Sequence, residues 1–77
     1  MDIDIKNPIE INPKILGGKP VIKGTRIPLY LILQMIQDGL DFNEILTEYP
    51  KLHVDDIKAA IEFAIHRINE EEIELAN

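Results

Sequence analysis

The sequence contains no cysteine, no serine and no tryptophan in its 77 residues. Because the two side chains most often used as nucleophiles are missing, covalent catalysis through serine or cysteine is excluded. The absence of cysteine also excludes disulfides and thiolate metal sites, and it is typical of proteins from a reducing compartment. We therefore expect a cytoplasmic protein that is not an enzyme and that carries no cofactor.

Long apolar runs are also missing. No stretch approaches the roughly 20 apolar residues that cross a bilayer, and the acidic start lacks the basic segment of a signal peptide. A soluble protein without membrane contact is therefore expected. A chain of this length forms one domain with a small core, and such domains gain stability by self-association. We accordingly expect a homodimer.

Charge is distributed unevenly along the chain, although its net value is -6. Between residues 11 and 37 every charged side chain is a cation, and from residue 38 onward eleven acids face three bases. This asymmetry predicts two surfaces for two kinds of partner, a basic surface suited to phosphates and an acidic surface suited to a cationic protein. The alternative explanation of the acids from residue 38 onward is that they form an ordinary helix face exposed to solvent.

Short strands are expected in the N-terminal arm, residues 1–27. Isoleucines alternate with polar residues around 3–5 and again around 9–11, which is the two-residue period of a strand. A third strand over 20–23 follows a glycine pair, and this pair is a natural turn for a hairpin with residues 15–16.

Two helices are predicted next, each with recognisable ends. Pro28 suits the first turn of a helix, because its missing N–H costs no hydrogen bond there. Gly39 suits the position just past the end of the same helix. Asp41 and Glu44 have the spacing of a capping box, which predicts the start of a short helix that Pro50 closes.

A third, longer helix is predicted from residue 53 or 54 onward. It carries one apolar stripe and either ends near residue 69 or continues through the acidic tail, residues 70–77. A strand-rich arm followed by three helices over 28–69 is typical of a mainly α (α+β) domain with a homeodomain-like helix-turn-helix bundle. We treat residues 1–77 as one such domain.

Residues 17–28 form the most unusual segment, with three glycines, two prolines and three cations. A Walker A phosphate loop requires Gly-Lys-Ser/Thr in that order, but here Lys23 precedes Gly24. Pro20 also lacks one of the backbone N–H groups that bind phosphate in such a loop. A structural turn is therefore expected instead of a nucleotide site. The residues expected to shape it are Gly17, Gly18, Gly24 and Pro28.

Two groups of histidines and acids resemble metal ligands only superficially, because neither has a recognised ligand spacing. His53 and Asp56 are better explained as residues that begin a helix. Glu62 and His66 are better explained as an exposed pair one helical turn apart. The full groups are His53, Asp55 and Asp56, and Glu62, His66 and Glu70. No metal site is expected.

The run GGKPVIKGTRIP at residues 17–28 resembles the signature of a small prokaryotic family, domain of unknown function 433. The similarity covers about Ile11 to Ala64, with further matches at Gly39, Tyr49-Pro50 and Asp56-Ile57. Members of that family are similar to homeodomain-like helix-turn-helix proteins, and many look like antitoxins encoded beside a PIN-like ribonuclease toxin. The resemblance therefore implies a dimeric antitoxin that neutralises its toxin and binds its own operator DNA.

Two sets of candidate binding residues follow. The basic candidates, for DNA or a partner, are Lys14, Lys19, Lys23 and Arg26. The acidic candidates, for a toxin-facing surface, are Asp55, Asp56 and Glu62. The planar guanidinium of Arg26 suits a partner carboxylate, a DNA phosphate or a local carboxylate equally.

Asp55 and Asp56 lie at the expected start of the last helix, which would be the recognition helix of a helix-turn-helix protein. Carboxylates at this position repel phosphates, so they argue against reading of a DNA groove by that helix. Two further functions therefore stay open beside the antitoxin: a DNA-binding regulator without a toxin, and a plain dimerisation domain.

Overall fold

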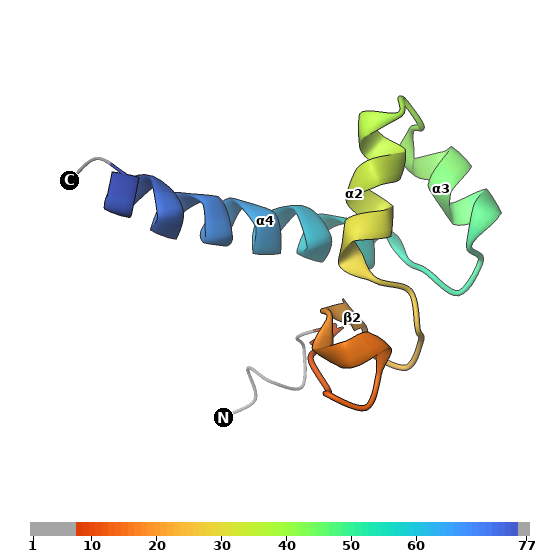
Figure 1. The fold of residues 1–77 in the computed structure, drawn as a ribbon. Helices are drawn as coiled ribbons and strands as arrows, with labels where there is room; N and C mark the ends of the chain where they lie inside the picture. The colour runs from red at the N-terminus through yellow and green to blue at the C-terminus, as the bar shows by residue number, and fades with distance from the viewer. Residues whose placement is uncertain (1–7, 76–77) are drawn as a thin grey trace.

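The structure is a computed structural model that describes residues 8–75, with side chains described through residue 70. A small sheet packs beside three helices, so the expected mainly helical α+β fold is confirmed (Figure 1). The elements in chain order are β1 (Ile9–Glu10), the 3-10 turn η1 (Leu16–Gly18), β2 (Val21–Ile22), α2 (Leu29–Gln37), α3 (Phe42–Glu48) and α4 (Val54–Leu75).

The sheet pairs β1 with β2 in antiparallel register, Ile9 opposite Ile22 and Glu10 opposite Val21. The predicted hairpin between residues 15–16 and 20–23 is therefore wrong. Leu16 cannot continue a strand, because it begins a run of three residues with positive φ that forms η1. The strand expected around residues 3–5 lies outside the described residues.

Both ends of α2 lie within a residue of their expected positions. Pro28 is the N-cap, one residue before the first helical residue. At the other end Gly39 has a φ of 97°, and its N–H donates to the carbonyl of Ile36 at 3.0 Å. The N–H of Leu40 donates to Met35 at 3.0 Å, which completes a Schellman motif. The role of Gly39 as helix terminator is confirmed.

The capping box at the start of α3 is also confirmed. The Glu44 N–H donates to Asp41 Oδ1, and the Asp41 N–H donates to Glu44 Oε1, each at 2.8 Å. Two N–H groups that the helix itself cannot satisfy are thus paired with carboxylates.

The core lies where the three helices meet. Ile32 of α2, Ile45 of α3 and Ile57 of α4 are each fully buried. Each such side chain contributes about 1.5–3 kcal/mol relative to an exposed position. The remaining buried apolar residues are Val21, Ile22, Leu29, Met35, Leu52 and Ala60. The sheet therefore packs on the helices through both strands, β2 with Ile22 in the core and β1 with Ile9 against it.

α4 continues through the acidic tail as far as Leu75, the longer of the two alternatives. Its first part packs on the core through Ile57 and Ala60, whereas every side chain from Ile65 to Glu70 is exposed. The second half of α4 accordingly projects away from the other elements (Figure 1). No helix in the described part of the chain is long and apolar enough to cross a membrane.

Candidate functional site

The glycine-rich segment folds into a tight turn that Thr25 holds together. The Thr25 N–H donates to the Ile22 carbonyl at 3.0 Å, and the Thr25 hydroxyl donates to the same carbonyl at 2.7 Å. The Ile27 N–H in turn donates to the Thr25 hydroxyl at 3.0 Å. Gly24 occupies the turn with a φ of 81°, and no atom lies within 4 Å of a Cβ added there. Gly24 is therefore needed for its backbone angle rather than for space.

The same segment leads the chain from the sheet into α2. The Ile22 N–H donates to the Ile27 carbonyl, and the Leu29 N–H donates to the Pro20 carbonyl, both at 3.0 Å. Pro28 is buried and forms a bridge with Val21. The apolar positions and the hydroxyl of the signature thus serve the fold, whereas its three cations are exposed.

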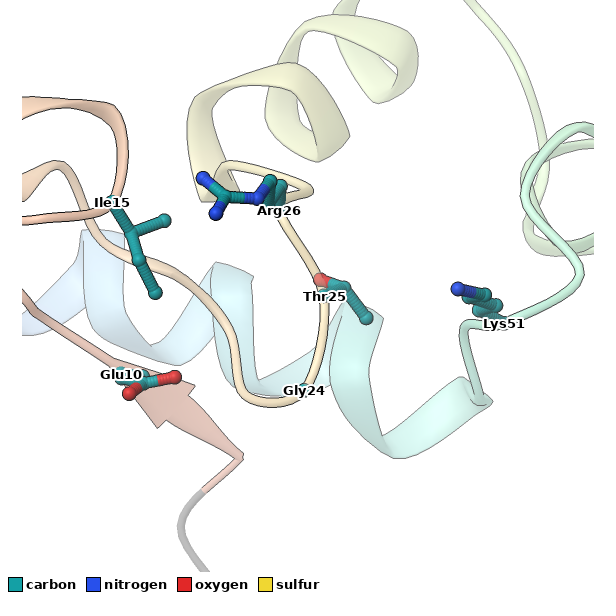
Figure 2. Close-up of a pocket in the computed structure, with 6 residues that line it drawn as sticks. All are labelled: Glu10, Ile15, Gly24, Thr25, Arg26 and Lys51. Atoms are coloured by element: carbon teal, nitrogen blue, oxygen red, sulfur yellow. The ribbon is translucent and has the colours of Figure 1, made fainter.

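Arg26 lines an open hollow with a volume of about 460 Å³ (Figure 2). Its side chain is exposed and forms no ion pair with any carboxylate of the described residues. Lys51, from the turn before α4, lines the same hollow, and Glu10 of β1 lies across it from Arg26. A local carboxylate pair for Arg26, one of the three sequence alternatives, is thus absent from the described part of the chain.

The structure does not gather the four predicted cations around one hollow. Lys14, Lys19 and Lys23 are exposed, as expected, but none of them lines the hollow of Arg26. The second cation of the Arg26 hollow is Lys51. The sequence did not predict it as a binding residue, because it lies far from Arg26 and within the acidic half of the chain. No spacing signal connects the two residues before the fold is known.

An acidic hollow, not predicted from the sequence, lies along α3. Its three carboxylates are those of Asp41, Glu44 and Glu48, and no cation lines it. Asn43 and Thr47 complete its polar lining, and its volume is about 400 Å³. The capping box fixes the first two carboxylates against the helix start, so this negative surface is ordered in advance.

The three acids predicted for a toxin-facing surface differ in their exposure. Asp56 is only 8% exposed, because its Oδ2 accepts a hydrogen bond from the His53 N–H at 2.8 Å. Little of its carboxylate is therefore exposed to a partner, and its toxin-facing role stays a prediction. Asp55 is exposed, and Glu62 is an exposed residue 3.9 Å from His66 Nε2, as the helical spacing predicts.

A third hollow, of about 390 Å³, is apolar and lies between α2 and α4. Tyr30 forms part of one wall and is 58% exposed, while Ile68 on the other wall is 59% exposed. The guanidinium carbon of Arg67 lies 5.1 Å from the ring centroid of Phe63, within cation–π range. The lining residues are Lys19, Pro20, Leu29, Tyr30, Leu33, Phe63, Ala64, Arg67 and Ile68. We call this hollow the α2–α4 groove.

Among the described residues, no three histidine or acidic side chains converge closely enough to hold a metal ion. The three hollows differ in lining: the first carries both signs of charge, the second is acidic and the third is largely apolar.

Comparison with known proteins identifies the family. The family model described as a protein of unknown function, DUF433, matches residues 9–64, which include the signature turn, all of α3 and the packed part of α4. The chain belongs to this family. The resemblance seen in the sequence is thereby confirmed.

Two relatives support the DUF433 assignment. The uncharacterized protein y4eO of Sinorhizobium fredii is 36% identical over 53 residues, which are 69% of this chain but 24% of that protein. The chain thus spans about a quarter of the length of this relative. The crystal structure of a DUF433 member from Anabaena variabilis superposes with a TM-score of 0.79 and 32% identity, covering 96% of this chain and 73% of the other.

Proposed function

We propose that the protein is the antitoxin of a type II toxin–antitoxin pair and that it inhibits a PIN-like ribonuclease by direct binding. The observation that carries the proposal is the acidic hollow of α3, where three carboxylates gather without a cation among the lining residues. A ribonuclease attracts RNA through a positive surface, and an acidic protein can occupy that surface. Charge complementarity would also speed capture of the toxin.

The acids of α3 are better candidates for the toxin-binding surface than the acids of α4. Glu48 has no hydrogen bond or ion pair within the described residues, so its charge is available to a partner. On α4, Asp56 is buried in a helix cap and Glu62 already faces His66. Asp55 and Glu62 stay exposed, however, so a binding experiment must compare the two surfaces directly.

Co-expression tests the proposal in cells. The open reading frame adjacent to the gene should encode a PIN-like ribonuclease that arrests growth when expressed alone, and co-expression of this chain should restore growth. The two proteins should also purify together in low salt. Growth arrest that this chain does not relieve, together with no complex, would contradict the antitoxin function.

Operator binding is a second candidate, favoured by two features of the fold. Asp56 is only 8% exposed and its Oδ2 accepts the His53 N–H, so its carboxylate is not presented at the surface of the α4 start as that of Asp55 is. Arg26 and Lys51 share a hollow next to that helix start, so two cations are available to phosphates.

A gel shift on the upstream promoter tests operator binding. The double variant Arg26→Ala/Lys51→Ala should bind DNA more weakly and with a smaller salt dependence, because each phosphate contact releases counterions. Lys14→Ala is the control, since Lys14 lies outside the hollow. Equal binding by the double variant and the wild type would rule out this surface.

A further inference from the structure

The second half of α4 lacks a partner within the described part of its own chain. The helix is about 33 Å long, at 1.5 Å per residue, but its packed residues end near Ala64. Beyond that point Ile65 is 52% exposed and Ile68 is 59% exposed. An isolated helical projection of this kind is marginal in water, because most helix stability in proteins comes from packing of an apolar face.

The α2–α4 groove lies at the base of this projection. Ile68 belongs both to the groove and to the projecting half of α4, so the two apolar surfaces are continuous. Tyr30, the most exposed aromatic residue of the chain's described part, stands at the opposite wall. In the described part of the chain, the apolar groove therefore lies beside a helix half whose isoleucines, Ile65 and Ile68, are exposed.

We propose that a second copy of this chain occupies the α2–α4 groove, with the projecting halves of the two α4 helices packed antiparallel about a two-fold axis. In this arrangement each projecting helix covers the groove of the other copy, and both exposed surfaces are buried by one closed contact. The two helices run antiparallel in this arrangement because the proposed two-fold axis is perpendicular to them.

Charge complementarity supports a second copy as the occupant. The charged residues that line the groove are both cations, Lys19 and Arg67. The end of α4 is strongly acidic, with four glutamates among residues 70–74. The helix that a second copy brings to the groove thus carries the opposite charge, whereas an arbitrary apolar partner would leave these cations unpaired.

The size of the contact fits a stable dimer. Residues 61–75 of each helix extend over about 21 Å, and each copy also contributes the groove walls formed by α2. A standard interface buries about 1,200–2,000 Å² in total, which is the area that the two helices and their grooves would have to bury together. A 77-residue domain has a small core, so this added burial would contribute substantially to its stability.

Sedimentation equilibrium of the full chain tests the dimer without any ribonuclease present, so its outcome is independent of the antitoxin function. The wild type should sediment at twice its 8.8 kDa mass. Ile68→Glu and Tyr30→Glu should each raise the dissociation constant by at least about 100-fold, because two copies of the change lie in one interface. Ile11→Glu is the matched control, since Ile11 is 56% exposed but lies outside the groove.

Two measurements keep the test decisive. Far-UV circular dichroism should show that the variants remain folded, with any loss of helix signal no larger than the projecting half of α4, which loses its packing when the dimer dissociates. In the wild type, hydrogen exchange of the backbone N–H groups of residues 66–70 should slow as protein concentration rises. Three results would each overturn the proposal. They are a wild type that is monomeric at about 100 μM, dimerisation of both Ile68→Glu and Tyr30→Glu as strong as that of the wild type, and hydrogen exchange of residues 66–70 that does not depend on protein concentration.

Discussion

The backbone N–H of His53 donates a hydrogen bond to Asp56 Oδ2 at 2.8 Å, across the first turn of α4. The neighbouring Asp55 is exposed and forms no such bond. Two adjacent carboxylates, identical in charge and equally close to the helix start, therefore have different roles. One satisfies a backbone donor that the helix leaves unpaired, and the other is free to meet solvent or a partner.

Replacement of Asp56 should destabilise the protein. Asp56→Ala removes the acceptor of the His53 N–H, so the free energy of unfolding should fall by about 0.5–2 kcal/mol. Asp55→Ala is the matched control and should change it by less than about 0.5 kcal/mol. Urea denaturation followed by circular dichroism measures both. Equal effects of the two substitutions would contradict the capping role of Asp56.

Thr25 should be needed for its hydroxyl. Thr25→Val keeps the shape of the side chain but removes the bonds to the Ile22 carbonyl and from the Ile27 N–H, which are partly buried. The Ile22 carbonyl keeps its bond from the backbone N–H of residue 25, but the Ile27 N–H is left unpaired, which should cost about 1–3 kcal/mol of unfolding free energy. Thr25→Ser retains the hydroxyl and should recover most of the loss in the same denaturation experiment. A stable valine variant would show that the turn does not depend on these bonds.

Gly39 should be needed for its positive φ alone. A Cβ added at this position meets no atom within 4 Å, so Gly39→Ala introduces backbone strain without a clash. Thermal unfolding should show a loss of about 1–2 kcal/mol, the usual cost of the left-handed conformation for a residue with a Cβ. Gly39→Asn should lose less, because asparagine tolerates this conformation better. An alanine variant as stable as the wild type would contradict the Schellman assignment.

Features determined by neighbouring residues could be predicted from the sequence. The Asp41–Glu44 capping box and the Gly39 terminator each depend on groups within about one helical turn, so the residue spacing carries the information. The order of the three helices follows from such local signals. The family resemblance adds independent support for the same order of elements.

Features that depend on distant contacts could not be predicted. The strand partner of Val21–Ile22 is β1 rather than residues 15–16, because Leu16 adopts a positive φ that its residue type does not reveal. Lys51 joins Arg26 only through the packing of the turn before α4 near the signature segment. Burial likewise separates Asp56 from Asp55, although the two are adjacent in sequence.

Inhibition of the purified ribonuclease tests the antitoxin function most directly. A matched pair of variants separates the two acidic surfaces, since Asn43→Lys/Glu48→Lys and Asp55→Lys/Glu62→Gln change the net charge equally. Neither pair alters the carboxylates of the α3 capping box or the His53–Asp56 bond. Any difference between them therefore reports the location of the contact.

The measurement is RNA cleavage by the PIN-like ribonuclease encoded by the adjacent gene, titrated with this chain at low salt. We expect the wild type to inhibit cleavage at near-equal amounts of the two proteins. The α3 variant should require at least about 10-fold more protein, and the α4 variant should inhibit like the wild type. Undiminished cleavage in the presence of excess wild-type protein would contradict the proposed function.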